Sequence, residues 1–581
     1  MGEPEHVTEA ATMVPENNVS WKDVLASIEF KRKAKAGKEL CAPPPGSYAV
    51  TSYVAPKPEH LAVGSTTAAT DGSATAASGP SQTQPKRPVP DRPAERRSAR
   101  IAASNSSSKR KAEEPLQSSS KRIKVKDTDK DSKLHVTVQT GLYAAEMFAA
   151  NVAVKHVLNL IVIDNIVWVW YYDRQGTIQC SGIDFVADLP RFMVLLYALQ
   201  RFKAKDWGRN EHFKKAQKEG YLKLDIDGVD LELHTSSEER VTHYGLKGRA
   251  TNVFPVTSKF LAKKYANDPG VKKDGMVAKI FWAEEQRDSE PEILKKVAEI
   301  AEKEEAVKGH VPQLLWSHKF ENPTSTIRKA LGVPEAEKGS RVLYILVFRK
   351  LLPITALEGE ELFNVWRQCI LCHIALWKEG VHHRDVSPPN MMFYKTDKGV
   401  LIGVLNDFDL SSLATRQGPQ GNERTGTVPF MALDLLTPEG QRGEVEHLYR
   451  HDLESFIWVL VWVCLRYRQG VLLPPEIRPF DAWATAGPEA CREKKLSFLD
   501  RFVKYKAPGI HPQIWRLVVE CLAVLDMDRH RRRRIAILQE LSSEPGEGGN
   551  TDADEGELDA DDFLANFTST ATWVRISKSL T

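Results

Sequence analysis

HHRDVSPPN, at residues 382–390, is the stretch of this 581-residue sequence that decides the fold. It places Asn390 five residues after Asp385, with Arg384 directly before the aspartate. Phosphoryl transfer needs a carboxylate that accepts the proton of the attacking hydroxyl group, and a side chain that holds a metal ion against the phosphates. The spacing of Asp385 and Asn390 meets both needs, so we predict a catalytic loop for phosphoryl transfer.

Three further strings follow this loop in order. They are NDFD (406–409), GTVPFMALD (426–434) and HDLESF (451–456). Asp407 comes directly after a strand-like segment, and its carboxylate is the kind of oxygen ligand that Mg²⁺ prefers. HDLESF opens an apolar helix, IWVLVWVCL. Four strings in this order and at these distances form a stronger signal than any one of them alone.

Together the strings resemble the fungal-type protein kinase family. The resemblance rests on H-R-D-[IV]-S-x-x-N, on D-F-D in place of D-F-G, on G-T-x-P-F-M-A and on H-D-x-E-S-F, and it covers residues 19–35 and 135–540. It implies a bilobal protein-kinase-like fold, ATP and Mg²⁺ as cofactors, and transfer of the γ-phosphoryl group to protein hydroxyl groups of the Ser/Thr type.

The resemblance also implies roles for the matching residues. Asp385 is the catalytic base or positions the hydroxyl group, and Lys279, in VAKI, holds the α and β phosphates. Glu290 is implied as the partner of Lys279, in preference to Glu292, because it stands three residues before an apolar pair. The implied Mg²⁺ ligands are Asn390 and Asp407.

Other implied roles are structural or regulatory. Asp452 is expected to anchor the backbone of the catalytic loop, and Asp434 to pair with an arginine, for which the run at 529–534 is one source. Arg384 can pair with a phosphate on the activation segment. The candidate phosphorylation sites there are Thr425 and, second, Thr415.

Two departures from the family pattern keep other functions open. Ser387 stands where typical Ser/Thr kinases carry a lysine, and Gly248 is all that remains of the glycine-rich loop that covers ATP. These departures favour a pseudokinase scaffold, which binds partners without turnover. A small-molecule phosphotransferase is a second alternative, because such enzymes also place Asp and Asn five residues apart. The 426–434 string argues against it.

Composition divides the chain. We predict a mostly disordered region at 1–134 with an ordered piece near 19–35, an α/β extension at 135–245, a kinase core at 246–540 with its N-lobe to about 350, and an acidic tail at 541–581. The prediction of disorder rests on the Ala, Pro, Ser and Thr bias of residues 40–133, which offers few groups to offset the entropy of ordering.

Charge is segregated although the net charge is only +3. Residues 109–124 hold two basic clusters, Lys109-Arg110 and Lys121-Arg122-Ile-Lys124, with the spacing of a bipartite nuclear-import signal. We therefore expect an import receptor as partner and a nuclear location, with a share in the cytoplasm allowed. The basic arm lacks interleaved aromatic residues, so no specific nucleic acid is predicted. No apolar run approaches a membrane span.

Periodicity predicts strands first and helices afterwards, which is the α+β class. We expect helices over 141–160 and 188–203, and strands over 161–172 and 177–185 joined by a turn at 173–176. Further strands are expected at 221–234, 240–247, 252–256, 276–282, 342–349, 391–394 and 401–406.

Overall fold

The computed structural model describes residues 20–35, 38–39, 134–242, 244–414, 426–504, 509–510, 512–542, 565, 568 and 573–574. The import signal at 109–124, the candidate sites Thr415 and Thr425, and most of the acidic tail lie outside the described residues. No helix within the described ranges is both long and apolar enough to cross a membrane.

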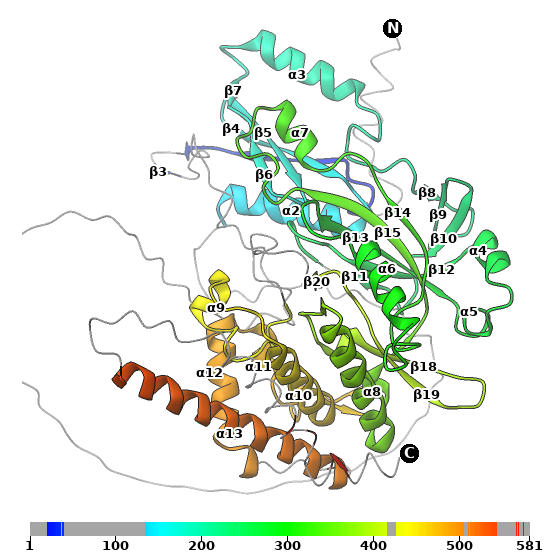
Figure 1. The fold of residues 1–581 in the computed structure, drawn as a ribbon. Coiled ribbons are helices and arrows are strands. Elements are labelled where there is room, and N and C mark those ends of the chain that lie inside the picture. The colour runs from blue at the N-terminus through cyan, green and yellow to red at the C-terminus, as the bar shows by residue number, and fades with distance from the viewer. Residues whose placement is uncertain are drawn as a thin grey trace, which may run out of the picture. The chain divides into compact units, whose positions relative to one another are not determined.

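The first sheet joins segments from both sides of residues 40–133. Its strand order is β1-β4-β5-β6, with β7 also paired to β5, and β1 runs parallel to β4 (Figure 1). The bounds are β1 Ala26–Lys31, β4 His156–Ile163, β5 Ile166–Asp173, β6 Thr177–Gln179 and β7 Ile183–Asp184. Helix α2 (Val136–Ala150) packs on this sheet through a core that includes Phe148 and Trp170.

Three predictions for this region are wrong. The expected strand over 177–185 is two short strands, β6 and β7, which both pair with β5. The single strand over 161–172 is a hairpin of β4 and β5, because the chain turns at Asp164, which has a φ of 53°. The helix over 141–160 ends at Ala150, since residues from His156 onward alternate between buried and partly buried positions as a strand does. The turn at 173–176 is confirmed, and the Asp173 carboxylate accepts hydrogen bonds from the backbone N–H groups of Gln175 and Gly176.

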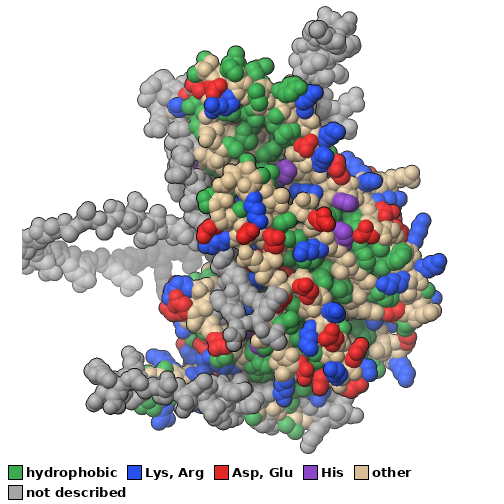
Figure 2. Space-filling view, turned by 45° about the horizontal axis from the view of Figure 1, so that its top comes forward, with side chains coloured by type: hydrophobic (Ala, Val, Ile, Leu, Met, Phe, Trp, Pro, Cys, Tyr) green, Lys and Arg blue, Asp and Glu red, His purple; other side chains and the backbone are tan. Residues whose placement is uncertain are grey.

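Helix α3 (Leu189–Arg201) lies on the outside of the first sheet. Asp188 caps its first turn, and none of its residues is buried. Figure 2 shows hydrophobic side chains gathered at the top of the molecule, where α3 lies. The most exposed of those on α3 are Leu189, Met193, Val194 and Tyr197.

The second sheet has the order β14-β15-β13-β12-β10-β9-β8, with β11 paired to β12. It therefore crosses the boundary that the sequence suggests at residue 245. The bounds are β8 Lys214–Lys215, β9 Tyr221–Ile226, β10 Val229–His234, β11 Val241–Thr242, β12 Asn252–Thr257, β13 Met276–Glu284, β14 Leu314–Lys319 and β15 Arg341–Arg349. The helices beside it are α4 Lys259–Lys264, α5 Pro269–Asp274, α6 Glu290–Ala301 and α7 Ser325–Ala330.

Strand β13 is buried on both faces and divides two cores. Ala278, Ile280 and Trp282 enter a core on one face of the sheet, to which β10 and β12 also contribute residues. Phe281 and Ala283 enter the large core shared with α6 and the C-terminal helices. Because side chains alternate along a strand, Lys279 lies on the same face as Phe281, toward α6.

The remainder of the chain is mainly helical. Its principal helices are α8 (Gly359–Lys378), α10 (Tyr449–Arg466), α12 (Pro488–Leu499) and α13 (Pro512–Ser542). Shorter elements are β2 Ala34–Lys35, β3 Lys38–Glu39, β16 Leu352–Pro353, η3 Ile354–Ala356, β17 Val381–His382, η4 Pro388–Asn390, β18 Met391–Lys395, β19 Leu401–Leu405, β20 Ser412–Leu413, α9 Pro438–Arg442, β21 Tyr467–Arg468, β22 Val471–Leu472, α11 Asp481–Thr485 and η5 Phe502–Lys504.

Helix α10 explains how this helical part is held together. Nearly all of its residues are buried, and its run from Phe456 to Leu465 is apolar all round, as expected for a buried helix. Trp366 of α8 donates from Nε1 to the carbonyl oxygen of Phe456 on α10 at 2.9 Å. Trp573, near the end of the chain, packs against Phe363 and Trp366 with ring centroids 5.7 and 5.8 Å apart. The sheets and these helices together confirm the α+β class.

Candidate active site

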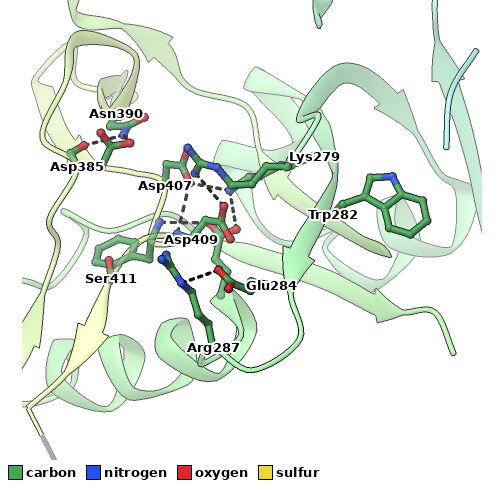
Figure 3. Close-up of polar contacts among 12 residues, drawn as sticks. Lys279, Trp282, Glu284, Arg287, Asp385, Asn390, Asp407, Asp409 and Ser411 are labelled. Carbon is green, nitrogen blue, oxygen red and sulfur yellow. Dashed lines mark hydrogen bonds and ion pairs between the residues drawn. The ribbon is translucent and has the colours of Figure 1, made fainter. Parts of the chain in front are cut away.

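Lys279 lies at the centre of the polar cluster between the second sheet and the helical part. Its Nζ is 2.6 Å from Oε2 of Glu290 and 2.7 Å from Oδ1 of Asp407 (Figure 3). Strand β13 presents the lysine, α6 begins with the glutamate, and Asp407 follows β19. The structure thus brings together three predicted residues that are separated by up to 128 positions.

The choice between Glu290 and Glu292 has a local explanation. Glu292 accepts a hydrogen bond from the backbone N–H of Ser289 at 3.0 Å, so it caps the start of α6. Glu290 is 1% exposed and points inward, where its Oε1 accepts from the backbone N–H of Phe408 at 3.3 Å. Glu290 therefore links α6 to both Lys279 and the D-F-D string.

The charges of this cluster are unequally stabilised. Burial acts to raise the pKa of Asp407, but the cations Lys279 and Arg249 outweigh burial and hold the pKa at about 2. Burial raises the pKa of Glu290, with Lys279 opposing the rise. For Lys279, burial acts to lower the pKa, and the carboxylates of Asp407 and Glu290 raise it above its usual value. Lys279 and Asp407 are therefore charged at neutral pH.

Asp385 and Asn390 lie together at the catalytic loop (Figure 3). Asn390 donates from Nδ2 to the carbonyl oxygen of Asp385 at 2.8 Å and to its Oδ2 at 3.3 Å. Oδ1 of Asp385 accepts from the backbone N–H of Thr427 at 3.0 Å and from its hydroxyl group at 2.9 Å. Burial raises the pKa of Asp385, while the charge of Arg249 lowers it.

Asp452 supports the backbone beside Asp385. Its Oδ2 accepts from the backbone N–H of Arg384 at 3.1 Å, and its two oxygens contact the Nε2 atoms of His373 and His447 at 2.8 and 2.7 Å. Arg384 has a φ of 67°, an uncommon conformation for a side-chain-bearing residue, so its backbone needs such support. Burial lowers the pKa of the Arg384 guanidinium, and the nearby charge of Arg287 adds to this effect.

The two aspartates of the D-F-D string face different partners. Asp407 has a φ of 65° and contacts Lys279. Oδ2 of Asp409 accepts from Nη1 of Arg249 at 2.9 Å, and its side chain is 7% exposed. The positive φ of this string falls at Asp407 and not at Asp409, the position where D-F-G kinases carry glycine. Sequence reasoning missed Arg249, since the motif searched for in that loop consists of glycines.

The loop that carries Arg249 is held from the first sheet. The backbone N–H of Gly248 donates to the carbonyl oxygen of Arg174 at 2.9 Å. Nη1 of Arg174 in turn donates to the carbonyl oxygen of Gly245 at 2.6 Å. Gly248 has a φ of 105°, which favours glycine, but its N–H is already used inside the protein. The predicted contact of the Gly248 backbone with ATP is therefore not provided by this N–H group.

Asp434 forms ion pairs with two of the C-terminal helices, α10 and α13. Its Oδ2 is 2.6 Å from Nη1 of Arg532 and 2.7 Å from Nη1 of Arg450. Burial acts to raise its pKa, but the hydrogen bond to His451 and the two arginines hold the pKa well below its usual range. The structure thus pairs Asp434 with the 529–534 run and also with Arg450, which sequence reasoning missed.

The residues present fit a hard divalent cation. Asp407 offers a carboxylate and Asn390 an amide oxygen, the ligand types that Mg²⁺ uses beside nucleotide phosphates. Within the described ranges, no group of three or more His, Cys, Asp or Glu side chains forms a self-contained metal site. A cation here would therefore depend on oxygens from the nucleotide as further ligands.

Comparison with known proteins agrees with this geometry. Residues 100–464 match the family described as fungal protein kinase. Among solved structures, the "Structure of vaccinia related kinase 3" is similar with 11% identity, covering 62% of this chain and 93% of that chain, and its TM-score of 0.33 is too low to bear on the fold. The family match extends over more than half of the sequence and includes the Lys279, Asp385 and Asp407 strings, and the chain belongs to the fungal protein kinase family.

Proposed function

We propose that this protein is an ATP-dependent protein kinase that phosphorylates Ser or Thr hydroxyl groups of other proteins. Two observations made together carry the proposal. Lys279 contacts both Glu290 and Asp407, and Asn390 is hydrogen-bonded to Asp385 in the same site. These side chains meet from β13, α6 and the two loops after α8 and β19. A lysine held between two carboxylates is pre-positioned to receive phosphate oxygens.

The chemistry assigns a task to each residue. In the transfer, the acceptor oxygen bonds to the γ-phosphorus, the bond to the β,γ-bridging oxygen breaks, and that oxygen leaves on ADP with the electron pair. Asp385 takes the hydroxyl proton, and its raised pKa makes it a better proton acceptor than a solvated carboxylate. Asn390 and Asp407 would hold Mg²⁺, which supplies charge stabilisation on the phosphates.

The segment at 426–434, which we call the peptide platform, supports a protein substrate rather than a small alcohol. Nζ of Lys495, a fully buried side chain, donates to the carbonyl oxygen of Met431 at 2.6 Å. Oε1 of Glu454 accepts from the backbone N–H of Leu433 at 2.9 Å. These contacts fix the segment after Thr427 against α10 and α12, beside Asp385, where an extended peptide can lie.

The test is transfer of radiolabelled phosphate from ATP to a mixture of proteins, with Asp385→Asn and Lys279→Met beside the wild type. We expect labelled Ser or Thr in the wild type and a loss of roughly 100-fold or more for Asp385→Asn with ATP still bound, because the proton acceptor is removed. If the wild type binds nucleotide but transfers no phosphate, the protein is instead a pseudokinase scaffold. Labelling of small alcohols alone would establish a small-molecule phosphotransferase.

A further inference from the structure

Ser387 leaves the region around Asp385 without the cation that typical Ser/Thr kinases supply two residues after this aspartate. The Ser387 side chain is buried, at 2% exposed, and it carries no charge. Lys279 is 8% exposed and is already shared between Glu290 and Asp407. Charge that develops on the transferred group therefore calls for a different cation.

Arg249 is placed to be that cation. Its Nη1 is 2.9 Å from Oδ2 of Asp409, while the backbone N–H of Asp409 is 3.4 Å from Oδ1 of Asp407. The guanidinium thus contacts the residue two positions after the expected metal ligand Asp407. The Arg249 side chain is 33% exposed, and a guanidinium has five N–H donors, so it can meet a ligand that enters the site.

The electrostatic environment keeps Arg249 charged. Burial acts to lower its pKa, but the carboxylates of Asp409, Asp407 and Asp385 outweigh burial and raise the pKa above its usual value. Two of these carboxylates, Asp385 and Asp407, are the ones assigned to the acceptor hydroxyl group and to the metal under the proposed function. A guanidinium among them offers planar, paired donors that suit phosphate oxygens.

The first sheet fixes the loop that presents Arg249. The carbonyl oxygen of Arg249 accepts from the backbone N–H of Trp282 on β13 at 2.8 Å. On the other side, Arg174 bonds the backbone of Gly245 and Gly248 and lies over the ring of Phe148 at 4.1 Å. Asp173, next in the chain, forms a buried ion pair with Arg328 of α7. The loop is therefore held by backbone hydrogen bonds to Trp282 and Arg174 and by the side chain of Arg174.

We propose that Arg249 binds the terminal phosphate of ATP in place of the missing lysine at position 387, and that Asp409 orients its guanidinium for this contact. The inference rests on the proposed function. Arg249 takes no proton in the transfer. Its positive charge stabilises the negative charge on the non-bridging oxygens while the phosphorus–oxygen bond to ADP breaks.

Nucleotide affinity tests this without relying on turnover. We would measure, by calorimetry with Mg²⁺, the binding of ADP and of an ATP analogue with an imido bridge between the β and γ phosphates. Wild type should prefer the analogue. Arg249→Ala should lose roughly tenfold or more of that preference, the loss of one charge-assisted hydrogen bond, with ADP affinity almost unchanged. Arg249→Lys should retain part of it.

The controls separate this inference from the proposed function. Arg442→Ala removes an exposed arginine that pairs with Glu439 and Glu444, and it should bind both nucleotides as wild type does. If Arg249→Ala unfolds at a lower temperature than wild type, Arg249→Gln is measured by the same criterion. A wild-type preference that persists in every Arg249 variant overturns this inference alone. A wild type that binds neither nucleotide overturns the proposed function as well.

Discussion

Thr427 donates two hydrogen bonds to a single oxygen of Asp385, from its backbone N–H at 3.0 Å and from its hydroxyl group at 2.9 Å. The two residues are separated by 42 positions. The contact joins the catalytic loop to the start of the 426–434 segment. The carboxylate that we propose as the proton acceptor is therefore oriented by the segment that we propose to carry the substrate.

Thr427→Val keeps the shape of this side chain and removes its hydroxyl group. Because that hydroxyl stabilises the ionised form of Asp385, its loss should raise the pKa of Asp385 further. Asp385 must be ionised to accept a proton, so the acid limb of the kcat/KM profile should move to higher pH. Thr427→Ser, which keeps a hydroxyl group, should restore the wild-type profile. Identical profiles for valine and wild type would contradict the assignment of Asp385 as the base.

The two aspartates of D-F-D should differ in their dependence on metal. Asp407→Ala should abolish Mg²⁺-dependent transfer, because the carboxylate ligand is lost. Asp409→Gly should leave a reduced but measurable activity, because it frees Arg249 without touching the metal ligand. Transfer measured against Mg²⁺ concentration for both variants checks this. Equal loss of activity in the two variants would show that Asp409 also binds metal, as the small-molecule phosphotransferase alternative allows.

Asp452 should contribute strongly to stability. It is 1% exposed, and Asp452→Ala would leave His373, His447 and the Arg384 backbone N–H without their shared acceptor. The cost should be about 3–5 kcal/mol in the free energy of unfolding by denaturant. Burial acts to raise the pKa of Asp452, but the two histidines hold it well below 3.8, so its contribution is present above pH 3.8 and is lost as the pH falls toward the folded pKa.

A surface aspartate provides the matched control for this stability measurement. Asp397 is 73% exposed and is 3.9 Å from Nζ of Lys273, a distance at which an exposed pair contributes little. Asp397→Ala should therefore unfold within about 0.5 kcal/mol of wild type. If Asp452→Ala is as mild as this control, the anchoring role of Asp452 is wrong.

Lys495 should make stability depend on pH in the alkaline range. Burial lowers its pKa to about 8 from 10.5. Between these values the unfolded chain binds more protons than the folded protein, so the stability of wild type relative to Lys495→Met should rise as the pH goes from 8 to 10.5. The expected change is on the order of 1–3 kcal/mol. A constant difference between the two proteins across this range would contradict the lowered pKa of Lys495.

Nuclear import remains a prediction from residues outside the described ranges. Replacing Lys121, Arg122 and Lys124 by Ala should leave a fluorescently tagged protein spread through the cytoplasm. In the control, three serines of the same segment, Ser118, Ser119 and Ser120, are replaced by Ala. This change should leave the tagged protein in the nucleus. If the variant that lacks Lys121, Arg122 and Lys124 still accumulates in the nucleus, the predicted import signal is wrong.

Local spacing explains what could be predicted from the sequence. Asp385, Asn390 and Asp407 lie within short strings in which one loop fixes the distance between functional groups, and Lys279 follows from its place on a buried strand. The hydrogen bond of Asn390 to Asp385 follows from this spacing, whereas no prediction paired Lys279 with Asp407. The family resemblance added Glu290, whose partner is only 11 residues away.

Other parts of the site depend on contacts that no local pattern records. Arg249 meets Asp409 across 160 residues, and its loop is held by Arg174, in the turn that follows β5 of the first sheet. Strand β14 was missed because a β-bulge interrupts its pairing with β15. The hairpin at Asp164 was missed because an aspartate followed by an asparagine, without glycine, gave a weak turn signal inside a long apolar run.

The parallel pairing of β1 with β4 has a consequence for protein engineering. Ser27 lies opposite Asn159, so this pairing closes a loop that spans 132 residues. Loop-closure entropy grows only with the logarithm of length, by about 0.6 kcal/mol for each doubling. The length of the connection is therefore nearly neutral for the fold. Residues 20–35 could be supplied as a separate peptide that completes the edge of the sheet, which would convert the protein into a two-component system whose assembly is set by peptide concentration.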